Sequence, residues 1–468
     1  MTATSHDLFI PRIEPADIMW SVPPPTLEVA SQTHQVTRVD HPDNLPKALQ
    51  DLTNSFADSI LHILPKDSAL FPVIPQELTA PTASPQVKVT DEYLLPALHQ
   101  ARLIKTQEEL QLIKKANEIS SRAHETVMRV LGAAVRGAIT KGEGAGETRP
   151  LLPGEWLIEK EAEAEAIFVA SCRREGSNHQ AYLPIVASST RASILHYCCN
   201  DKEFSWGPVR PHDHHNRNEL AHGGERDLSP QVLLIDAGCE WINYASDSGV
   251  SFRLCEFSRR ITYSSFIVTR TMPVGNGGKF TPEAKAIYTL VHEMQRLSFE
   301  AIRPGLHWDA IQLICHQTLV RGFQKLGIFK SPNSPGSGSW NSEEAIVASG
   351  VSAAFFPHGV GHSLGMDVHD VPSASKPLVN PTIQKGQELG HPDFYTYLRL
   401  RLPLEVGMVV VSDPLPSSSP WSGASGSYVC TTRPSNQAST SRPTCWRQFG
   451  DPNTSITMSS RDMRAWGA

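Results

Sequence analysis

The segment from Phe355 to Asp370 constrains this chain more than any other, because histidine, aspartate and glycine are concentrated in it. No glutamate follows its first histidine, and glycines stand at 359 and 361, so it does not match the helical HExxH pattern of zinc proteases. Glycine instead lets a backbone turn closely around a ligand. One histidine alone would be interpreted as structural, but three at this spacing favour a ligand-binding loop. The polar residues concerned are His358, His362, Asp367, His369 and Asp370.

Two aspartates follow a buried-strand pattern earlier in the chain. Val232 to Ile235 is an apolar run, and Asp236 at its end would be costly to desolvate unless its charge were compensated. Asp247 comes eleven residues later, a distance that suits a turn at Gly238 and a returning strand. Two carboxylates side by side need a cation between them, and hard divalent ions bind oxygen ligands. The spacing indicates a metal site, although a purely structural pair of aspartates explains it equally well.

The mixture of helices and hairpin-like strands favours an α+β fold over a doubly wound one. Thr106 and Glu109 form a capping box before an amphipathic helix that Gly132 can end. A second helix over about 156–172 carries an acidic run, which we interpret as a solvated face. Thr281 caps a third helix, with proline at its first position. Strands are predicted at 183–187, 193–197, 232–236 and 408–411.

The composition excludes several classes of protein. The 468 residues carry a net charge of −6 without a basic block, so no nucleic-acid partner is expected. The N-terminal sequence is not that of a signal peptide, and no stretch approaches 18 consecutive apolar residues, so no membrane span is expected. The eight cysteines contain no CxxC pair, which argues against zinc ribbons and a disulfide framework. We therefore expect a cytoplasmic protein with reduced thiols.

Several of these sequences together resemble one family. LIDAG at 234–238, YASD at 244–247, VTRT at 268–271, ILHY at 194–197 and FFPHGVGHSLGMDVHDVPS at 355–373 are similar to motifs of the Xaa-Pro aminopeptidases and prolidases, most closely the fungal members. The resemblance runs from about residue 7 to 411. It implies an α+β catalytic domain of the pita-bread type at 99–411. A partial, smaller α/β domain at 1–98 would precede it, and a divergent, disordered tail at 412–468 would follow.

The resemblance also implies a site and a reaction. Two manganese ions would be bound by five side chains, of which this chain offers Asp236, Asp247 and His362. His358 and His369 would bind substrate and stabilise charge near the scissile bond, and His196 would line the substrate pocket. The substrates would be peptides with proline at the second position. A homodimer is among the expected assemblies.

The chain departs from the family pattern in two places. Residues 248–267 separate Asp247 from VTRT, which the family joins directly. The charged side chains of this insertion predict that it is extruded as a loop rather than added to the buried sheet. Near the end of the match the family has a glutamate ligand where this chain has Asp413, and a later G-x-R-I-E motif is absent. Both departures contain Val-Ser, which a retained splice-donor sequence would encode.

Several interpretations of function stay open at this point. The leading one is a manganese-dependent aminopeptidase that removes a residue preceding proline, and the closest alternative is an Xaa-Pro dipeptidase. A homologue without catalysis, acting as a peptide-binding module, is favoured by the missing glutamates and opposed by the intact histidine motif. Metal-free creatinase-like chemistry is disfavoured, because all three metal-type residues named above are present. We expect the chain to bind at most one manganese ion firmly, since the nucleophile of a two-metal site needs both ions.

Overall fold

The structure is a computed structural model of the chain. It describes residues 5–55, 60–65, 88–135, 158–205, 228–247, 252–253, 262–263, 269–336, 338–375, 390–412, 428–430, 445–447 and 455–456. The chain divides into two compact units, Met1–Ala101 and Arg102–Ala468. All six site residues predicted above belong to the second unit.

The first unit combines parallel strand pairs with helices. Its two pairs are β1 (Asp7–Phe9) with β2 (Arg38–Asp40), and β3 (Ile60–His62) with β4 (Lys88–Thr90). Thr26 caps the first helix, because its side chain accepts a hydrogen bond from the backbone N–H of Val29. The helices are α1 (Leu27–Thr33), α2 (Leu45–Ser55) and α4 (Leu94–Leu103), the last of which crosses into the second unit.

The predicted helices of the second unit are present. The capping box is confirmed, since Thr106 and Glu109 exchange backbone-to-side-chain hydrogen bonds of 2.7 and 3.3 Å. The helix continues past Gly132, so the predicted end there is wrong. Burial of its apolar face outweighs the cost of about 1 kcal/mol for a glycine inside a helix. The helices are α5 (Gln107–Val135), α6 (Glu161–Arg174), α7 (Pro282–Ala301), α8 (Trp308–Lys325) and α9 (Glu343–Ala348).

Antiparallel sheets complete the second unit, which confirms the predicted α+β class. One sheet has the order β12-β7-β6, a second β5-β8-β9, and a third β11-β10-β14-β13, in which β10 is Phe252–Arg253 and β11 is Thr262–Tyr263. The strand predicted at 193–197 is wrong, because a short helix, η4 (Ser189–Ser193), and irregular chain occupy this region. The strands are β5 (His179–Gln180), β6 (Ile185–Ser188), β7 (Gln231–Asp236), β8 (Cys239–Trp241), β9 (Tyr244–Ala245), β12 (Arg270–Val274), β13 (Gly361–Ser363) and β14 (Val409–Ser412).

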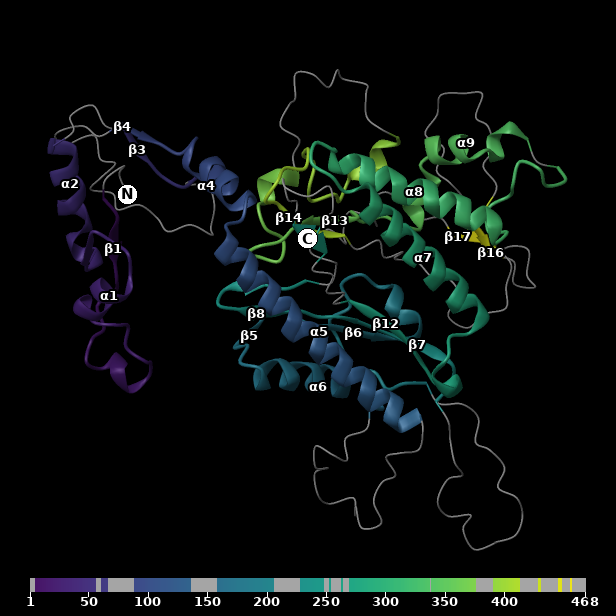
Figure 1. Cartoon of the computed structure of the whole chain (residues 1–468), viewed down its shortest axis with the longest axis horizontal. Helices are drawn as coiled ribbons and strands as arrows, with labels where there is room; N and C mark the ends of the chain where they lie inside the picture. The colour runs from purple at the N-terminus through teal and green to yellow at the C-terminus, as the bar shows by residue number, and fades with distance from the viewer. Residues whose placement is uncertain are drawn as a thin grey trace, which may run out of the picture. The chain divides into compact units, whose positions relative to one another are not determined.

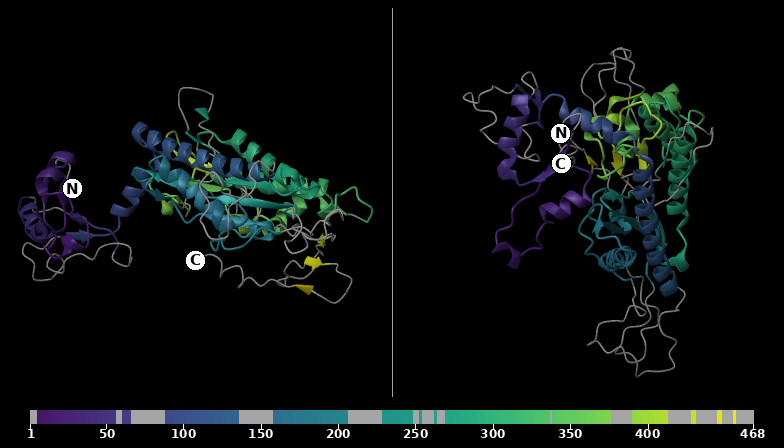
Figure 2. Two further views of the ribbon diagram at one scale, coloured as in Figure 1. Left: turned by 90° about the horizontal axis from the view of Figure 1, so that it is seen from below. Right: turned by 60° about the vertical axis from the view of Figure 1, so that its left-hand side comes forward.

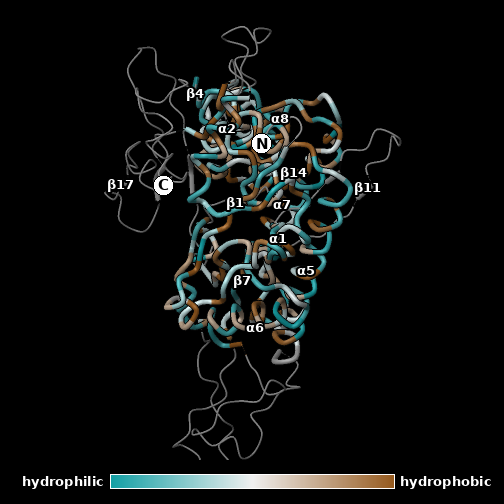
Figure 3. The backbone as a smooth tube through the Cα atoms, turned by 90° about the vertical axis from the view of Figure 1, so that its left-hand side faces the viewer, coloured by the Kyte–Doolittle hydropathy of each residue, from teal (hydrophilic) through white to brown (hydrophobic). Residues whose placement is uncertain are grey.

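Two large hydrophobic cores organise this unit. The first lies around α7 and α8, which pack side by side (Figures 1 and 2) and also cover β14. The second lies between α5, α6 and the sheet that contains β7. The tube of α5 carries both hydrophobic and hydrophilic stretches (Figure 3), as expected for a helix with one buried face. A small third cluster, which includes Ala245 and Val411, lies next to β9 and β14.

The inserted segment, 248–267, was predicted to be an extruded loop, but its described residues form strands. Strand β10 (Phe252–Arg253) pairs antiparallel with β14 and with β11 (Thr262–Tyr263), so the prediction of a purely extruded loop is wrong. Pairing uses backbone groups, and a two-residue strand can therefore join a sheet edge whatever the polarity of its sequence. The remainder of 248–267 lies outside the described residues.

The C-terminal region beyond β14 is described only in short pieces. Three strands, β15 (Tyr428–Cys430), β16 (Cys445–Arg447) and β17 (Ser455–Ile456), form one antiparallel sheet. Asp413 and most of the tail predicted to be disordered lie outside the described residues. Along the described parts of the chain, the search for a helix long and apolar enough to cross a bilayer finds none.

Candidate metal centre

Asp236 and Asp247 lie close together, as their spacing predicted. Asp236 ends β7, and the hydroxyl of Tyr182 donates to it over 2.6 Å and lies 3.2 Å from an oxygen of Asp247. The turn predicted at Gly238 is instead made by Ile242 and Asn243, whose φ angles of 49° and 62° lie in the left-handed region of a tight hairpin turn. This hairpin, β8–β9, returns the chain so that both carboxylates reach one phenol.

Gly238 has a different role from the one predicted. A Cβ atom at this position would lie 2.2 Å from the carbonyl oxygen of Ser246, so only glycine lets the two backbones approach so closely. The Ser246 hydroxyl is 2.9 Å from the backbone N–H of Cys239 and 2.8 Å from the hydroxyl of Ser120 on α5. These buried contacts fix the backbone immediately before Asp247 and so set the position of its carboxylate.

His362, on β13, completes the group. Its Nε2 lies 2.8 Å from an oxygen of Asp247, and its Nδ1 is 3.0 Å from the carbonyl oxygen of Ser363. A carbonyl oxygen can only accept, so Nδ1 carries a proton, and Nε2 is the nitrogen that can share a further proton or a cation with Asp247. Gly361 makes this strand pairing possible, because a Cβ atom there would lie 1.7 Å from the carbonyl oxygen of Val411 on β14.

His369 stacks edge-on against His362, with ring centroids 4.5 Å apart. Burial above all, together with the nearby His362, Arg399 and His196 and against the opposing charge of Asp247, lowers the pKa of His369 to about 3. The exposed His196 and Arg399 both lie near enough to His369 to influence its pKa, and the sequence interpretation did not single out Arg399. At neutral pH His369 is an uncharged imidazole.

His358 occupies a separate position at the start of the same loop. Its Nδ1 is 2.8 Å from the carbonyl oxygen of Gly359, and its ring lies edge-on to Phe356 with centroids 4.7 Å apart. Its own carbonyl oxygen accepts a hydrogen bond of 3.1 Å from Gln312 on α8. These contacts connect His358 to the hydrophobic core around α7 and α8.

A buried ion pair anchors the end of the segment 355–370, which we call the histidine loop. Lys105 donates to Asp370 over 2.8 Å, and the side chains of both residues are 1% exposed. Arg102 forms a second ion pair with Asp370. The backbone N–H of Asp370 donates to the carbonyl oxygen of Ser363, which closes the loop that carries His369. No sequence signal revealed this pairing, because the partners are 265 residues apart.

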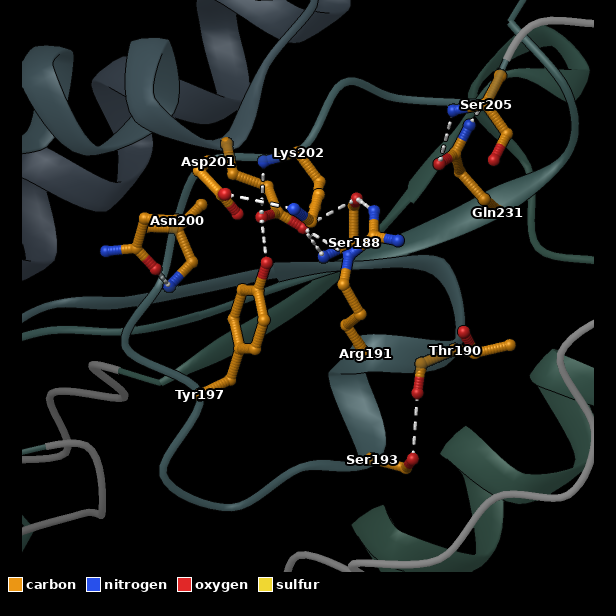
Figure 4. A network of polar contacts seen from close by, with 12 residues as sticks. Ser188, Thr190, Arg191, Ser193, Tyr197, Asn200, Asp201, Lys202, Ser205 and Gln231 are labelled. Carbon is orange, nitrogen blue, oxygen red and sulfur yellow. Dashed lines mark hydrogen bonds and ion pairs between the residues drawn. The ribbon is translucent and has the colours of Figure 1, made fainter.

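A buried carboxylate anchors the segment that carries His196. Glu161 at the start of α6 is fully buried, so the interpretation of the acidic run as a solvated face is wrong at this position. One of its oxygens accepts from the backbone N–H and hydroxyl of Ser188 and from Arg191, over 2.8 to 2.9 Å. The other accepts from the hydroxyl of Tyr197 over 2.7 Å and from the backbone N–H of Lys202 over 3.2 Å. Figure 4 shows these four donor residues turned toward one another.

The donor types at the centre fit a divalent metal ion, although only in part. Asp236 and Asp247 offer carboxylate oxygens, and His362 presents Nε2 with its Nδ1–H on a backbone carbonyl, the arrangement that metal-bound histidines use. No group of three or more His, Cys, Asp or Glu side chains converges as a full metal cluster among the described residues. Asp247 and His362 are in direct contact and Asp236 shares Tyr182 with Asp247, so the described residues form part of a metal site.

Comparison with known proteins finds Xaa-Pro aminopeptidases that are similar over most of the chain. A probable Xaa-Pro aminopeptidase of Paracoccidioides brasiliensis (strain Pb18) is 31% identical over 407 residues, covering 87% of this chain and 67% of the relative. One from Podospora anserina is 30% identical over 414 residues, covering 88% and 68%. The chain thus spans about two thirds of the length of these relatives.

Solved structures show the same architecture. Escherichia coli aminopeptidase P with the inhibitor Pro-Leu superposes with a TM-score of 0.60 at 23% identity, covering 90% of this chain and 73% of that one. Proline aminopeptidase P II from Yersinia pestis gives 0.58 at 24% identity, covering 90% and 74%. The pita-bread fold implied by the resemblance is therefore confirmed. Because residues 111–429 also match the profile of metallopeptidase family M24, a range that contains the paired aspartates and the histidine loop, the chain belongs to that family.

Proposed function

We propose that this chain is an aminopeptidase that removes the residue preceding a proline at position two of a peptide, and that it requires manganese. The observation that carries the proposal is the continuous contact from Asp236 through Tyr182 to Asp247, His362 and His369. These contacts bring the paired aspartates next to the histidine loop. The Xaa-Pro aminopeptidases named among the relatives support the choice of substrate.

Asp236, Asp247 and His362 would hold the metal. When bound, a divalent ion would polarise the scissile carbonyl and lower the pKa of a coordinated water. The hydroxyl of Tyr182 donates to Asp236 and lies 3.2 Å from Asp247, so it helps to orient both carboxylates. Burial, followed by the two aspartate charges, raises the pKa of Tyr182 well above its usual value, so the phenol remains a donor throughout the physiological range.

The remaining residues of the site would act on the peptide itself. The bond before proline is a tertiary amide without an N–H, so its nitrogen must receive a proton when the bond breaks. A neutral His369 would donate a hydrogen bond from its one ring N–H to a substrate oxygen, while the proton for the proline nitrogen would come from another group. Arg399 and His196 lie near His369 and would attract the carboxylate or carbonyl oxygens of a short peptide.

The direct test is hydrolysis by the full chain with added manganese. We expect slow cleavage of a tripeptide Xaa-Pro-Xaa, loss of that activity with a chelator, and no cleavage when alanine replaces proline. The Asp247→Asn and His362→Gln variants should lose both the activity and any manganese-dependent rise in thermal midpoint. Cleavage of Xaa-Pro dipeptides alone would make the chain a dipeptidase. Binding of the tripeptide without turnover would make it a peptide-binding module.

Metal stoichiometry provides an independent test. Titration calorimetry with manganese should show at most one firm site per chain, because Asp247 and His362 are in direct contact while no three such side chains converge among the described residues. Two equally tight sites would contradict this expectation. They would mean that residues such as Asp413, outside the described part of the chain, complete the second site.

A further inference from the structure

A fully buried polar side chain, Gln312 on α8, forms hydrogen bonds with the backbone of the histidine loop. Its Oε1 accepts a hydrogen bond of 2.6 Å from the backbone N–H of Val360. Its Nε2 donates over 3.1 Å to the carbonyl oxygen of His358. One amide therefore binds the backbone on both sides of Gly359, between the two histidines that the proposed function places in substrate binding and metal ligation.

These two backbone contacts determine the orientation of the amide. A backbone N–H can only donate and a carbonyl oxygen can only accept, so oxygen must face Val360 and nitrogen must face His358. The second hydrogen on the amide nitrogen then points to His316, whose Nε2 lies 3.2 Å away. His316 must accept at Nε2, so its proton is on Nδ1, which lies 3.0 Å from the hydroxyl of Ser352.

The histidine in this relay is itself rigidly packed. His316 is fully buried and stacks on Phe394 with ring centroids 3.7 Å apart and planes inclined by 15°. Phe356, two residues before His358, packs on the same ring at 5.2 Å. Ser352 is also fully buried, in the short helix η7 (Val351–Ala354). Neither the amide nor the imidazole has room to turn over, because protein atoms surround both.

We propose that Gln312, fixed by His316 and Ser352, is the positioning residue that sets the aim of His358 and His362. The inference rests on the proposed function for its effect on hydrolysis, but the geometry of the loop can be measured without it. Gly359, between the two bonded residues, makes the backbone adaptable just before β13, and the amide removes that freedom. Outer contacts of this kind typically change activity or metal affinity by about 10- to 100-fold when removed.

Three variants of the full chain separate positioning from folding. Gln312→Leu keeps the approximate volume and removes all three polar contacts. Gln312→Glu keeps the acceptor for Val360 but places an oxygen opposite the carbonyl of His358 and the lone pair of His316. Thr318→Val is the control, since Thr318 is a buried residue of the same helix whose hydroxyl bonds only within α8.

The readout is the 15N spectrum of histidine-labelled protein at pH 7, assigned with single-histidine variants. We expect wild type to show His316 as the neutral Nδ1–H form. Gln312→Glu should convert His316 to a form protonated at Nε2, and Gln312→Leu should shift the His358 and His362 signals. Thr318→Val should leave all three signals in place. Unchanged spectra in both Gln312 variants would overturn the proposal.

Hydrolysis of Xaa-Pro-Xaa with manganese provides the second readout. Both Gln312 variants should lose about 10- to 100-fold in kcat/KM at a temperature where each is folded, whereas Thr318→Val should keep its rate. Equal rates in the Gln312 variants and wild type would overturn the positioning role. Spectral shifts in the Gln312 variants of a chain whose wild type hydrolyses nothing would support the positioning of the loop and reject the proposed function.

Discussion

Replacing Glu161 with glutamine changes one oxygen of a buried carboxylate to an NH2 group. The loss of folding stability follows from the hydrogen-bond donors around it. The amide can keep an oxygen toward Ser188 and Arg191, but its NH2 group then faces the hydroxyl of Tyr197 and the backbone N–H of Lys202. The hydroxyl can rotate to accept, whereas the N–H cannot. One unsatisfied N–H and the loss of charge from the remaining hydrogen bonds should together lower the free energy of unfolding by about 2 to 4 kcal/mol.

The assay is urea unfolding of the full chain, followed by tryptophan fluorescence. Glu203→Gln is the matched control, because Glu203 makes an exposed ion pair with Lys160 and its side chain is 62% exposed. We expect a clearly lower urea midpoint for Glu161→Gln and nearly the wild-type midpoint for Glu203→Gln. Equal midpoints for the two variants would refute the reasoning that the buried donors depend on this carboxylate.

The same residue predicts a dependence on pH. Burial raises the pKa of Glu161, but the hydrogen bonds from Tyr197, Ser188 and Arg191 outweigh burial, so its pKa lies below the usual range. The stabilising contribution is therefore complete above the unfolded pKa of about 4.3 and is lost as pH falls through the lower folded value. The difference in stability between wild type and Glu161→Gln should shrink in acid below about pH 4. A difference that stayed constant down to pH 3 would contradict this assignment.

Three further substitutions test other parts of the unit. Lys105→Met should lower stability by about 3 kcal/mol in thermal unfolding, because Asp370 loses a buried partner; an unchanged midpoint would show that the pair contributes nothing. Gly361→Ala should abolish soluble expression or the native circular dichroism spectrum, since its Cβ would overlap the carbonyl of Val411; a native spectrum would mean that β13 can shift. Thr106→Ala should cost about 1 kcal/mol in urea unfolding through loss of the cap on α5, and Thr106→Ser should restore most of it if the hydroxyl is responsible.

Features set by residues a few positions apart could be predicted from the sequence. The capping box at Thr106, the cap at Thr281 and strand β7 each depend on local hydrogen bonds or on a short apolar run, and all three are present. The paired aspartates also followed from their spacing. Local patterns suffice in these cases because the partners are neighbours in the chain.

Features that depend on distant partners could not be predicted in this way. Glu161 sits in an acidic run typical of a solvated helix face, but its donors come from 27 to 41 residues further along the chain. Gln312 precedes the loop it binds by 46 to 48 residues, and nothing in its own neighbourhood indicates that role. Gly238 was interpreted as a turn because glycine commonly forms turns, whereas its missing side chain serves a close backbone approach.

The contact between His362 and Asp247 joins two cores that share no residues. We expect the two cores to open separately, so amide hydrogen exchange should reveal two cooperative regions, one around α7 and α8 and one around α5 and α6. The site exists only while both regions are closed. Its lifetime is therefore shorter than that of either region, and a ligand that binds across the contact would slow exchange in both at once.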